Sequence, residues 1–260
     1  MSATPALERR NPTVKLGLVV VISFVVMFVL DPWTPAVLYL LALTGVAVST
    51  RSGPRTLLVA HVPFAAFALG VLVVNALSRP GEILWQAGVL RVTTEGLTVG
   101  AALALRTLLV GVLAIGFLVS TDAVALMHSL GQNARLSPRV AYAVLAGHRL
   151  LQDMPREWAI IQHAHAVRAP LRRGGGPPRG PRHLARVVFS LLVVSVRRGE
   201  RMAQALESRG LGLHPRTTWR PVHVTPADWA LAASVLAVVA LVLLGSGWLG
   251  VLRGPAALTG

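Results

Sequence analysis

The stretch Leu97–Val119, LTVGAALALRTLLVGVLAIGFLV, decides the fold class, because its 23 residues contain a single charge, Arg106. A transmembrane helix needs about 20 apolar residues to cross a hydrocarbon core about 30 Å thick. Thr56–Leu77 and Ala227–Leu249 are also long enough, whereas Leu16–Leu30 and Pro35–Ser49 would reach only about 22 Å as helices. We therefore predict an all-α integral membrane protein with about five transmembrane helices.

The distribution of charge predicts the orientation of these helices. The chain is 54% hydrophobic, with a mean hydropathy of +0.64 and a net charge of +15. Of its 25 Lys and Arg residues, 16 lie between Thr121 and Pro226, beside the last predicted span. Basic segments flanking membrane spans remain on the cytoplasmic side. This places the N-terminus and the basic block in the cytoplasm and the C-terminus outside. Nucleic acid is not expected as a partner, because no aromatic-rich surface accompanies the charge.

We expect three regions along the chain. Residues 1–120 form a membrane domain with predicted spans at 16–30, 35–49, 56–77 and 97–119, and residues 226–260 form the final span and tail. Residues 121–225 form a cytoplasmic module with one short helix, Asp122–Leu130, and two long amphipathic helices. One opens at Ser137-Pro138 and stops at Pro170, and the other runs from His183 to Arg209. The segment Arg172–Arg182 between them is rich in Gly, Pro and Arg, which indicates a linker.

Two arginines at helix ends are the candidate binding residues. Arg168 lies in the last turn of the first long helix, and Arg209 precedes the terminating Gly210 of the second. A cation at a helix C-terminus is also stabilised by the helix dipole, which by itself would explain either arginine. Small residues flank both, however, and a guanidinium is suited to bidentate contacts with carboxylates. The small neighbours are Ala166 and Ala169 in the first case, and Ser208 and Gly210 in the second.

Motifs for catalysis and metal binding are missing from the sequence. It contains no Gly-rich phosphate loop and no His-Glu-x-x-His motif, and Lys15 is its only lysine. It has no cysteine, which excludes thiolate metal sites. His163 and His165 are two residues apart and would diverge on a helix. We therefore expect a non-catalytic chain without a cofactor or metal site, in which Arg106 has a packing role.

Several motifs resemble the transmembrane coupling subunit of energy-coupling-factor transporters, the EcfT/CbiQ family. Asn11-Pro12-Thr13-Val14-Lys15-Leu16 is similar to its N-terminal Asn-Pro-x-x-Lys-Leu motif. Glu95-Gly96, Leu105-Arg106 and Ser120-Thr121 are similar to its middle section, and Arg149, Pro155 and Glu157 to its long coupling helix. The most specific match is Arg197-Arg198-Gly199-Glu200 followed by Ala203–Gly210.

This resemblance implies a bacterial or archaeal cell-membrane importer, in which the chain passes motion from two ABC ATPase subunits to a small substrate-capture membrane protein. Arg168 and Arg209 match the two X-Arg-X motifs that grip the ATPases, although Ala169 and Ser208 depart from the usual Ala-Arg-Gly. Vitamins, cobalt and other transition metals are all compatible substrates. The helix faces expected to hold the capture protein consist of Val140, Val144, Leu151, Trp158, Ile161, Val188, Leu192, Met202 and Leu206.

Two other functions remain open. A conventional ABC permease subunit would form the substrate path with its own spans, and it usually carries a Glu-Ala-Ala…Gly loop, which this sequence does not contain. A membrane enzyme would need carboxylates or histidines clustered at one depth. Asp31, Asp122 and Asp228 instead lie at separate ends of the predicted spans.

Overall fold

The computed structural model describes residues 7–50, 53–87, 90–168, 180–213 and 221–251 of the chain. The chain forms two compact units. Met1–Leu126 together with His223–Gly260 are called the membrane unit, and Met127–Val222 are called the helical module. Helices account for most of the described residues, which confirms the predicted all-α fold class.

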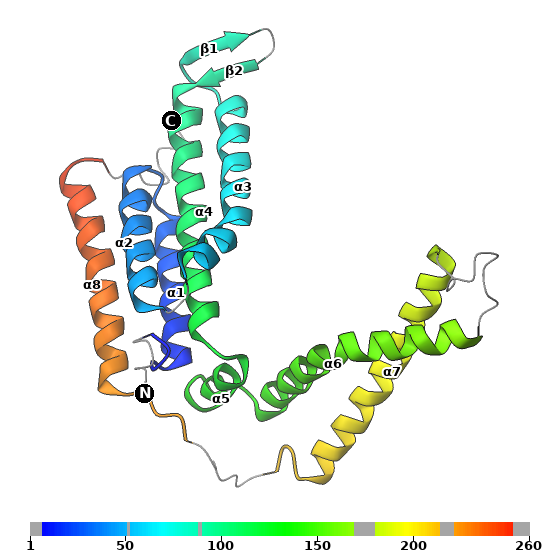
Figure 1. Cartoon of the computed structure of the whole chain (residues 1–260). Helices are drawn as coiled ribbons and strands as arrows, with labels where there is room; N and C mark the ends of the chain where they lie inside the picture. Colours follow the sequence, from blue (N-terminus) through cyan, green and yellow to red (C-terminus); the bar gives the residue numbers. More distant parts are fainter. Residues whose placement is uncertain (1–6, 51–52, 88–89, 169–179, 214–220, 252–260) are drawn as a thin grey trace. The chain divides into compact units, whose positions relative to one another are not determined.

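In the described part of the membrane unit, five helices each overlap one of the five predicted apolar segments (Figure 1). They are α1 (Pro12–Met27), α2 (Trp33–Ser49), α3 (Pro54–Ser78), α4 (Thr94–Ser120) and α8 (Pro226–Trp248). The last three of these are long and apolar enough to cross a membrane, and α1 and α2 are shorter apolar helices. α4 is central, since it packs against α1, α2 and α3. Its buried Leu109 and Val112 join Val26, Leu38 and Val239 in one core.

Glycines allow α3 and α4 to approach closely. A Cβ on Gly96 would lie 2.6 Å from the carbonyl oxygen of Asn75, and one on Gly100 would lie 3.0 Å from that of Leu72. Farther along α4, a Cβ on Gly111 would lie 2.7 Å from the ring of Phe64. Small residues at such spacing are typical of helix contacts in membranes, where backbones pack directly. The sequence of α4 thus determines which of its faces lies against α3.

A β-hairpin, which the sequence analysis did not predict, occupies the polar connection between α3 and α4. β1 (Ile83–Ala87) pairs antiparallel with β2 (Leu90–Thr93). The Glu95 carboxylate fixes the base of the hairpin by accepting hydrogen bonds from the Glu82 backbone N–H at 2.9 Å and from the Thr94 hydroxyl at 2.8 Å. It also fills the space where a side chain at Gly81 would lie.

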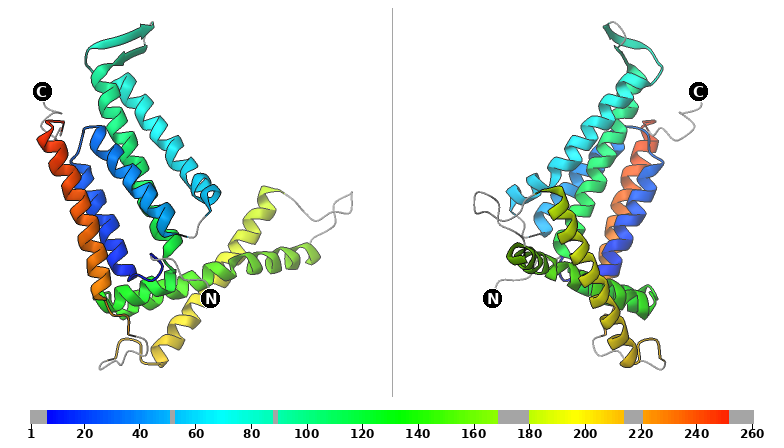
Figure 2. Two further views of the ribbon diagram at one scale, coloured as in Figure 1. Left: turned by 60° about the vertical axis from the view of Figure 1, so that its left-hand side comes forward. Right: turned by 90° about the vertical axis from the view of Figure 1, so that its right-hand side faces the viewer.

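Three helices lie between α4 and α8: α5 (Ala123–Asn133), α6 (Pro138–Arg168) and α7 (Pro181–Ser208). α6 begins at the predicted residue and continues through Pro155. α5 runs past its predicted last residue, Leu130, to Asn133. α7 begins two residues before its predicted start, so Pro181 and Arg182 belong to the helix rather than to the linker, and residues 172–179 lie outside the described residues. α6 and α7 pack against each other and cross at an angle (Figures 1 and 2).

Candidate functional site

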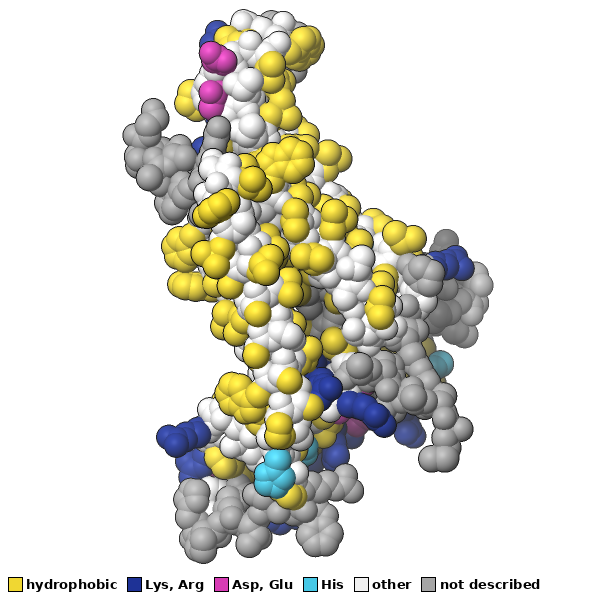
Figure 3. Space-filling model, turned by 90° about the vertical axis from the view of Figure 1, so that its left-hand side faces the viewer, with side chains coloured by type: hydrophobic (Ala, Val, Ile, Leu, Met, Phe, Trp, Pro, Cys, Tyr) yellow, Lys and Arg dark blue, Asp and Glu magenta, His cyan; other side chains and the backbone are white. Residues whose placement is uncertain are grey.

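The surface of the membrane unit has the composition of a lipid-facing surface. Hydrophobic side chains cover the face shown in Figure 3, and on α8 the exposed ones include Leu241 and Leu244. Trp229 and Trp248, both exposed, lie 19 positions apart on this helix, which is about 28 Å. Tryptophan concentrates at both interfaces of a membrane whose hydrocarbon core is about 30 Å thick. The distance between the two tryptophans along α8 therefore matches the thickness of a hydrocarbon core.

Lys15 binds the start of α1 to the end of α4. Its ammonium donates to the Ser120 carbonyl at 2.7 Å and to the Ser120 hydroxyl at 3.2 Å, and it also donates to the Leu7 carbonyl at 3.2 Å. Lys15 is only 5% exposed. Two of these bonds reach Ser120, the last residue of α4, whose carbonyl would otherwise lack a partner within the helix.

Asn11 binds the start of α1 to the start of α8. Its backbone N–H donates to Asp228 Oδ1 at 3.0 Å, while its own side-chain oxygen caps α1 at the Thr13 N–H. Asp228 Oδ2 accepts from the backbone N–H and the hydroxyl of Thr225, the N-cap residue of α8. Residues of the Asn-Pro-x-x-Lys-Leu motif therefore hold three helix ends together, at the point where the chain leaves and re-enters the membrane unit.

Arg106 has the packing role that the sequence analysis favoured. One of its terminal nitrogens donates to the Val29 carbonyl at 2.6 Å, where the chain turns between α1 and α2. In the same turn the buried Asp31 accepts from the Thr34 N–H at 2.7 Å and so caps α2. An arginine within a span needs such a partner inside the helix bundle.

Arg198 joins the two long helices of the module. From α7 it donates to Asp153 at 2.7 Å and to Glu157 at 2.9 Å, one turn apart on α6. A second contact lies nearer the C-terminal end of α6, where His165 is 3.0 Å from the Ser190 hydroxyl. Sequence analysis quoted Arg198 only as part of a motif. Its partners were missed, because they are 41 and 45 positions away.

Arg168 and Arg209 are exposed and lie at the C-terminal ends of α6 and α7. Arg168 is the last residue of α6; Ala166 before it is partly buried, and Ala169 lies outside the described residues. Arg209 follows Ser208 as the C-cap residue of α7. Within the described ranges, the structure gives neither arginine side chain a hydrogen bond or an ion pair.

Gly210 gives Arg209 a defined position. The Leu211 N–H donates to the Leu206 carbonyl at 3.0 Å, and the Gly210 N–H donates to the Glu207 carbonyl at 2.9 Å. These two bonds, with Gly210 at φ +80°, form a Schellman motif. The predicted C′ role of Gly210 is confirmed, and α7 ends at a fixed residue instead of fraying.

The proposed capture-protein residues do not share one environment. Val140, Val144, Leu151, Val188 and Leu192 are exposed, Trp158 is partly buried and Ile161 is buried. Met202 and Leu206 line a cavity of about 480 Å³ between α6 and α7, together with small residues that include Ala143 and Gly147. The five exposed residues are thus available to a partner, whereas Met202 and Leu206 face the helix crossing.

These features define the class: a helical integral membrane protein with a separate module whose two long helices each end at an exposed arginine. The sequence model of the CbiQ family, described as cobalt transport protein, matches residues 4–219, and the chain belongs to this family. The comparison confirms the resemblance drawn from the motifs.

The chain is similar to energy-coupling factor transporter transmembrane proteins EcfT. It is 27% identical to that of Heliobacterium modesticaldum, over 91% of this chain and 92% of the relative. The identity is 24% to that of Thermosediminibacter oceani, over 89% and 91%. A putative ABC transporter ATP-binding protein from Bifidobacterium longum is 23% identical over 93% of this chain, which corresponds to 32% of that relative's length.

Proposed function

We propose that the chain is the transmembrane energy-coupling subunit of an energy-coupling-factor importer. It transmits ATP-driven motion of two ABC ATPase subunits to a substrate-capture membrane protein. The membrane unit anchors the chain in the cell membrane through several spans, with the helical module in the cytoplasm. ATP is hydrolysed on the partner subunits, because this sequence has no phosphate-binding motif.

One observation carries this proposal: the two long helices are joined by the ion pairs of Arg198, and each ends at an arginine whose side chain has no partner in the part of the chain that the structure describes. Arg168 and Arg209 each dock into a groove on one ATPase subunit and pair with acidic groups there. A guanidinium forms bidentate contacts with carboxylates, which suits a joint that must transmit force. Motion of the ATPase pair would then move both helices, because Asp153 and Glu157 connect them through Arg198.

The Bifidobacterium longum relative supports the partnership with an ATPase. A segment similar to nearly the whole of this chain makes up 32% of a protein named as an ATP-binding protein of an ABC transporter. When the segment similar to this chain and an ATP-binding part share one polypeptide, each is held at high effective concentration near the other, as expected for parts that act together. The exposed apolar residues of α6 and α7, such as Val144, Leu151 and Leu192, are proposed to hold the capture protein.

Replacement of the terminal arginines tests the proposal. Arg168→Ala and Arg209→Ala should each weaken co-purification of the ATPases, and the double variant should abolish uptake of the transported vitamin or metal. Arg209→Lys keeps the charge but not the planar fork, so it should restore binding only in part. Arg156→Ala on α6 and Arg201→Ala on α7 are matched controls, because each removes an exposed arginine away from the helix ends. Normal uptake by a well-expressed double variant would refute the mechanism.

A conventional permease subunit is the alternative function. Such a subunit binds or conducts substrate within its own spans, whereas a coupling subunit purified alone should bind none with useful affinity. Equilibrium binding of labelled substrate to the isolated chain separates the two. The coupling function is favoured because the module with its two arginine-tipped helices has no role in forming a path through the membrane.

A further inference from the structure

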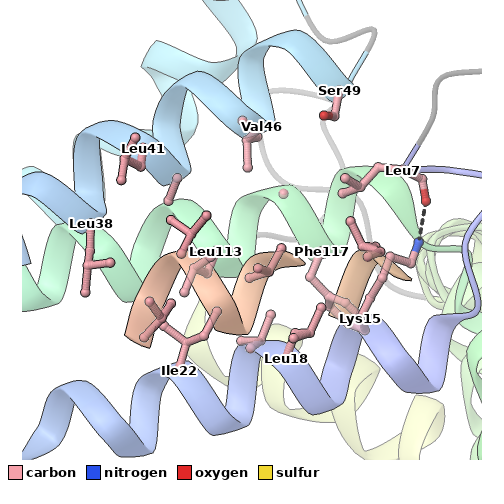
Figure 4. A pocket seen from close by; sticks show the side chains of 18 of the residues that line it. Leu7, Lys15, Leu18, Ile22, Leu38, Leu41, Val46, Ser49, Leu113 and Phe117 are labelled. Atoms are coloured by element: carbon pink, nitrogen blue, oxygen red, sulfur yellow. Dashed lines mark hydrogen bonds between the residues drawn. The ribbon is translucent and has the colours of Figure 1, made fainter. Parts of the chain in front are cut away.

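An apolar cavity of about 390 Å³ lies within the membrane unit, between α8 and the helices α1, α2 and α4. Ile22, Leu38 and Leu113 line its apolar part, and Lys15 lies at one end with Leu7 and Ser49 (Figure 4). Leu41 and Val238 line the cavity and are also exposed, so the cavity opens onto the surface of the unit. That surface faces lipid, because α8 and α2 carry apolar side chains outward.

The polar end of the cavity carries the Lys15 ammonium. It is buried, and its three hydrogen bonds go to neutral oxygens of Leu7 and Ser120. Glu8 and Asp228 act on its charge electrostatically, but among the described residues neither forms an ion pair or a hydrogen bond with it. The Ser49 hydroxyl, at the same end, has no hydrogen-bond partner within the described residues. A buried cation is costly unless counter-charges lie close to it, so an anion that reaches this end would add to the effect of the two carboxylates.

We propose that the cavity is a binding site for an anionic phospholipid, with one acyl chain between α8 and α2 and the phosphate group beside Lys15. The apolar walls exclude water but gain dispersion contacts from a hydrocarbon chain, which an empty cavity would forgo. The phosphate places a negative charge beside Lys15 from the open end of the cavity, and the Ser49 hydroxyl can donate to the phosphate or to an ester carbonyl.

The location of the cavity matches this ligand. Its polar end lies where α1 and α8 begin, at the level of Asp228 and one residue from the interfacial Trp229. Lipid headgroups occupy that depth, and Arg9 and Arg10 precede α1 in the sequence. Basic residues next to the cytoplasmic leaflet attract anionic lipids. The bound lipid would fill the space beneath α8 and so brace it against α1 and α2.

Gly45 offers a direct way to block the cavity. It lines the cavity, and a Cβ added there meets no other atom within 4 Å, so Gly45→Leu places a side chain in the space of the acyl chain without a clash at Cβ. Gly17→Leu is the matched control. Gly17 on α1 is equally open and exposed but does not line the cavity. Lys15→Gln removes the charge and leaves the apolar part unchanged.

Native mass spectrometry of the purified full chain, with phosphatidylglycerol or phosphatidylcholine added to the detergent, tests the proposal. The natural chain and Gly17→Leu should retain one phosphatidylglycerol, at least fivefold in preference to phosphatidylcholine. Gly45→Leu should retain neither lipid, and Lys15→Gln should bind the two about equally. Thermal unfolding provides a second readout: phosphatidylglycerol should raise the Tm of the natural chain and of Gly17→Leu, but not that of Gly45→Leu.

Two results would overturn the proposal. One is equal retention of phosphatidylglycerol by the natural chain and Gly45→Leu, which would place any bound lipid elsewhere on the surface. The other is an equal preference of the natural chain for the two lipids, which would deny Lys15 a role in recognition. Because Gly45→Leu fills a cavity instead of creating one, its fold should survive and either result can be interpreted.

Discussion

Replacing Arg198 with glutamine should uncouple ATP hydrolysis from uptake while leaving the ATPases bound. The arginine side chain is 33% exposed, and its partners Asp153 and Glu157 are 52% and 30% exposed. Ion pairs this accessible contribute about 0.2–1 kcal/mol each, so the two together contribute about 0.4–2 kcal/mol. A change of 1.4 kcal/mol is tenfold in an equilibrium. The equilibrium constant for α6 and α7 being joined at their crossing should therefore fall by a factor of about 2 to 30.

The assay is uptake and ATP hydrolysis measured together in proteoliposomes that contain the whole complex. Arg198→Gln should lower the substrate imported per ATP several-fold, because the helices no longer move as one body. Co-purification of the ATPases should be unchanged, since Arg168 and Arg209 remain. Arg197→Gln is the matched control, because this neighbouring arginine is exposed and the structure gives its side chain no described partner. Asp153→Asn and Glu157→Gln should each give a smaller loss of the same kind.

The reasoning is refuted if Arg198→Gln imports as much substrate per ATP as the natural chain. It is also refuted if Arg197→Gln causes an equal loss, since the effect would then follow from charge alone. A double-mutant cycle between Arg198 and Glu157 distinguishes the loss of this ion pair from a general loss of positive charge. The coupling energy should be nonzero for this pair and close to zero for Arg197 with Glu157.

Three further predictions concern the helix contacts and ends. Gly96→Ala should lower the Tm of the detergent-solubilised chain by several degrees, because its Cβ would press on a backbone carbonyl of α3, whereas Gly70→Ala, in open space, should not. Asp228→Ala should cost about 1–2 kcal/mol of stability, measured by chemical denaturation, by removing the cap of α8 and its bond to α1. Gly210→Ala should cost about 1 kcal/mol at φ +80° and should weaken ATPase binding through displacement of Arg209, measured by co-purification.

Much of the fold follows from local sequence patterns. The five apolar segments predict the membrane helices, because hydropathy is decided residue by residue within each segment. The caps at Thr225 and Gly210 are also local, since each depends on residues within a few positions. For the same reason α6 was placed correctly at its N-terminal residue, Pro138.

Contacts between distant segments could not be predicted in this way. The bond from Lys15 to Ser120 spans 105 positions, and that from Asn11 to Asp228 spans 217. The hairpin was missed because its strands have only five and four residues and are held by Glu95 from the following helix. Periodicity likewise identified Met202 as part of an apolar face but could not show that the face lies against α6.

The central claim is that the arginine-tipped ends of α6 and α7 each contact an ATPase, and the absence of cysteine from the chain allows a direct test. Val167→Cys and Ser208→Cys place single thiols beside Arg168 and Arg209 without removing either arginine, and both positions are exposed. Site-specific cross-linking of the assembled complex should join each thiol to an ATPase subunit. The account is contradicted if neither thiol cross-links to an ATPase, or if both react only with a reagent confined to the extracellular side.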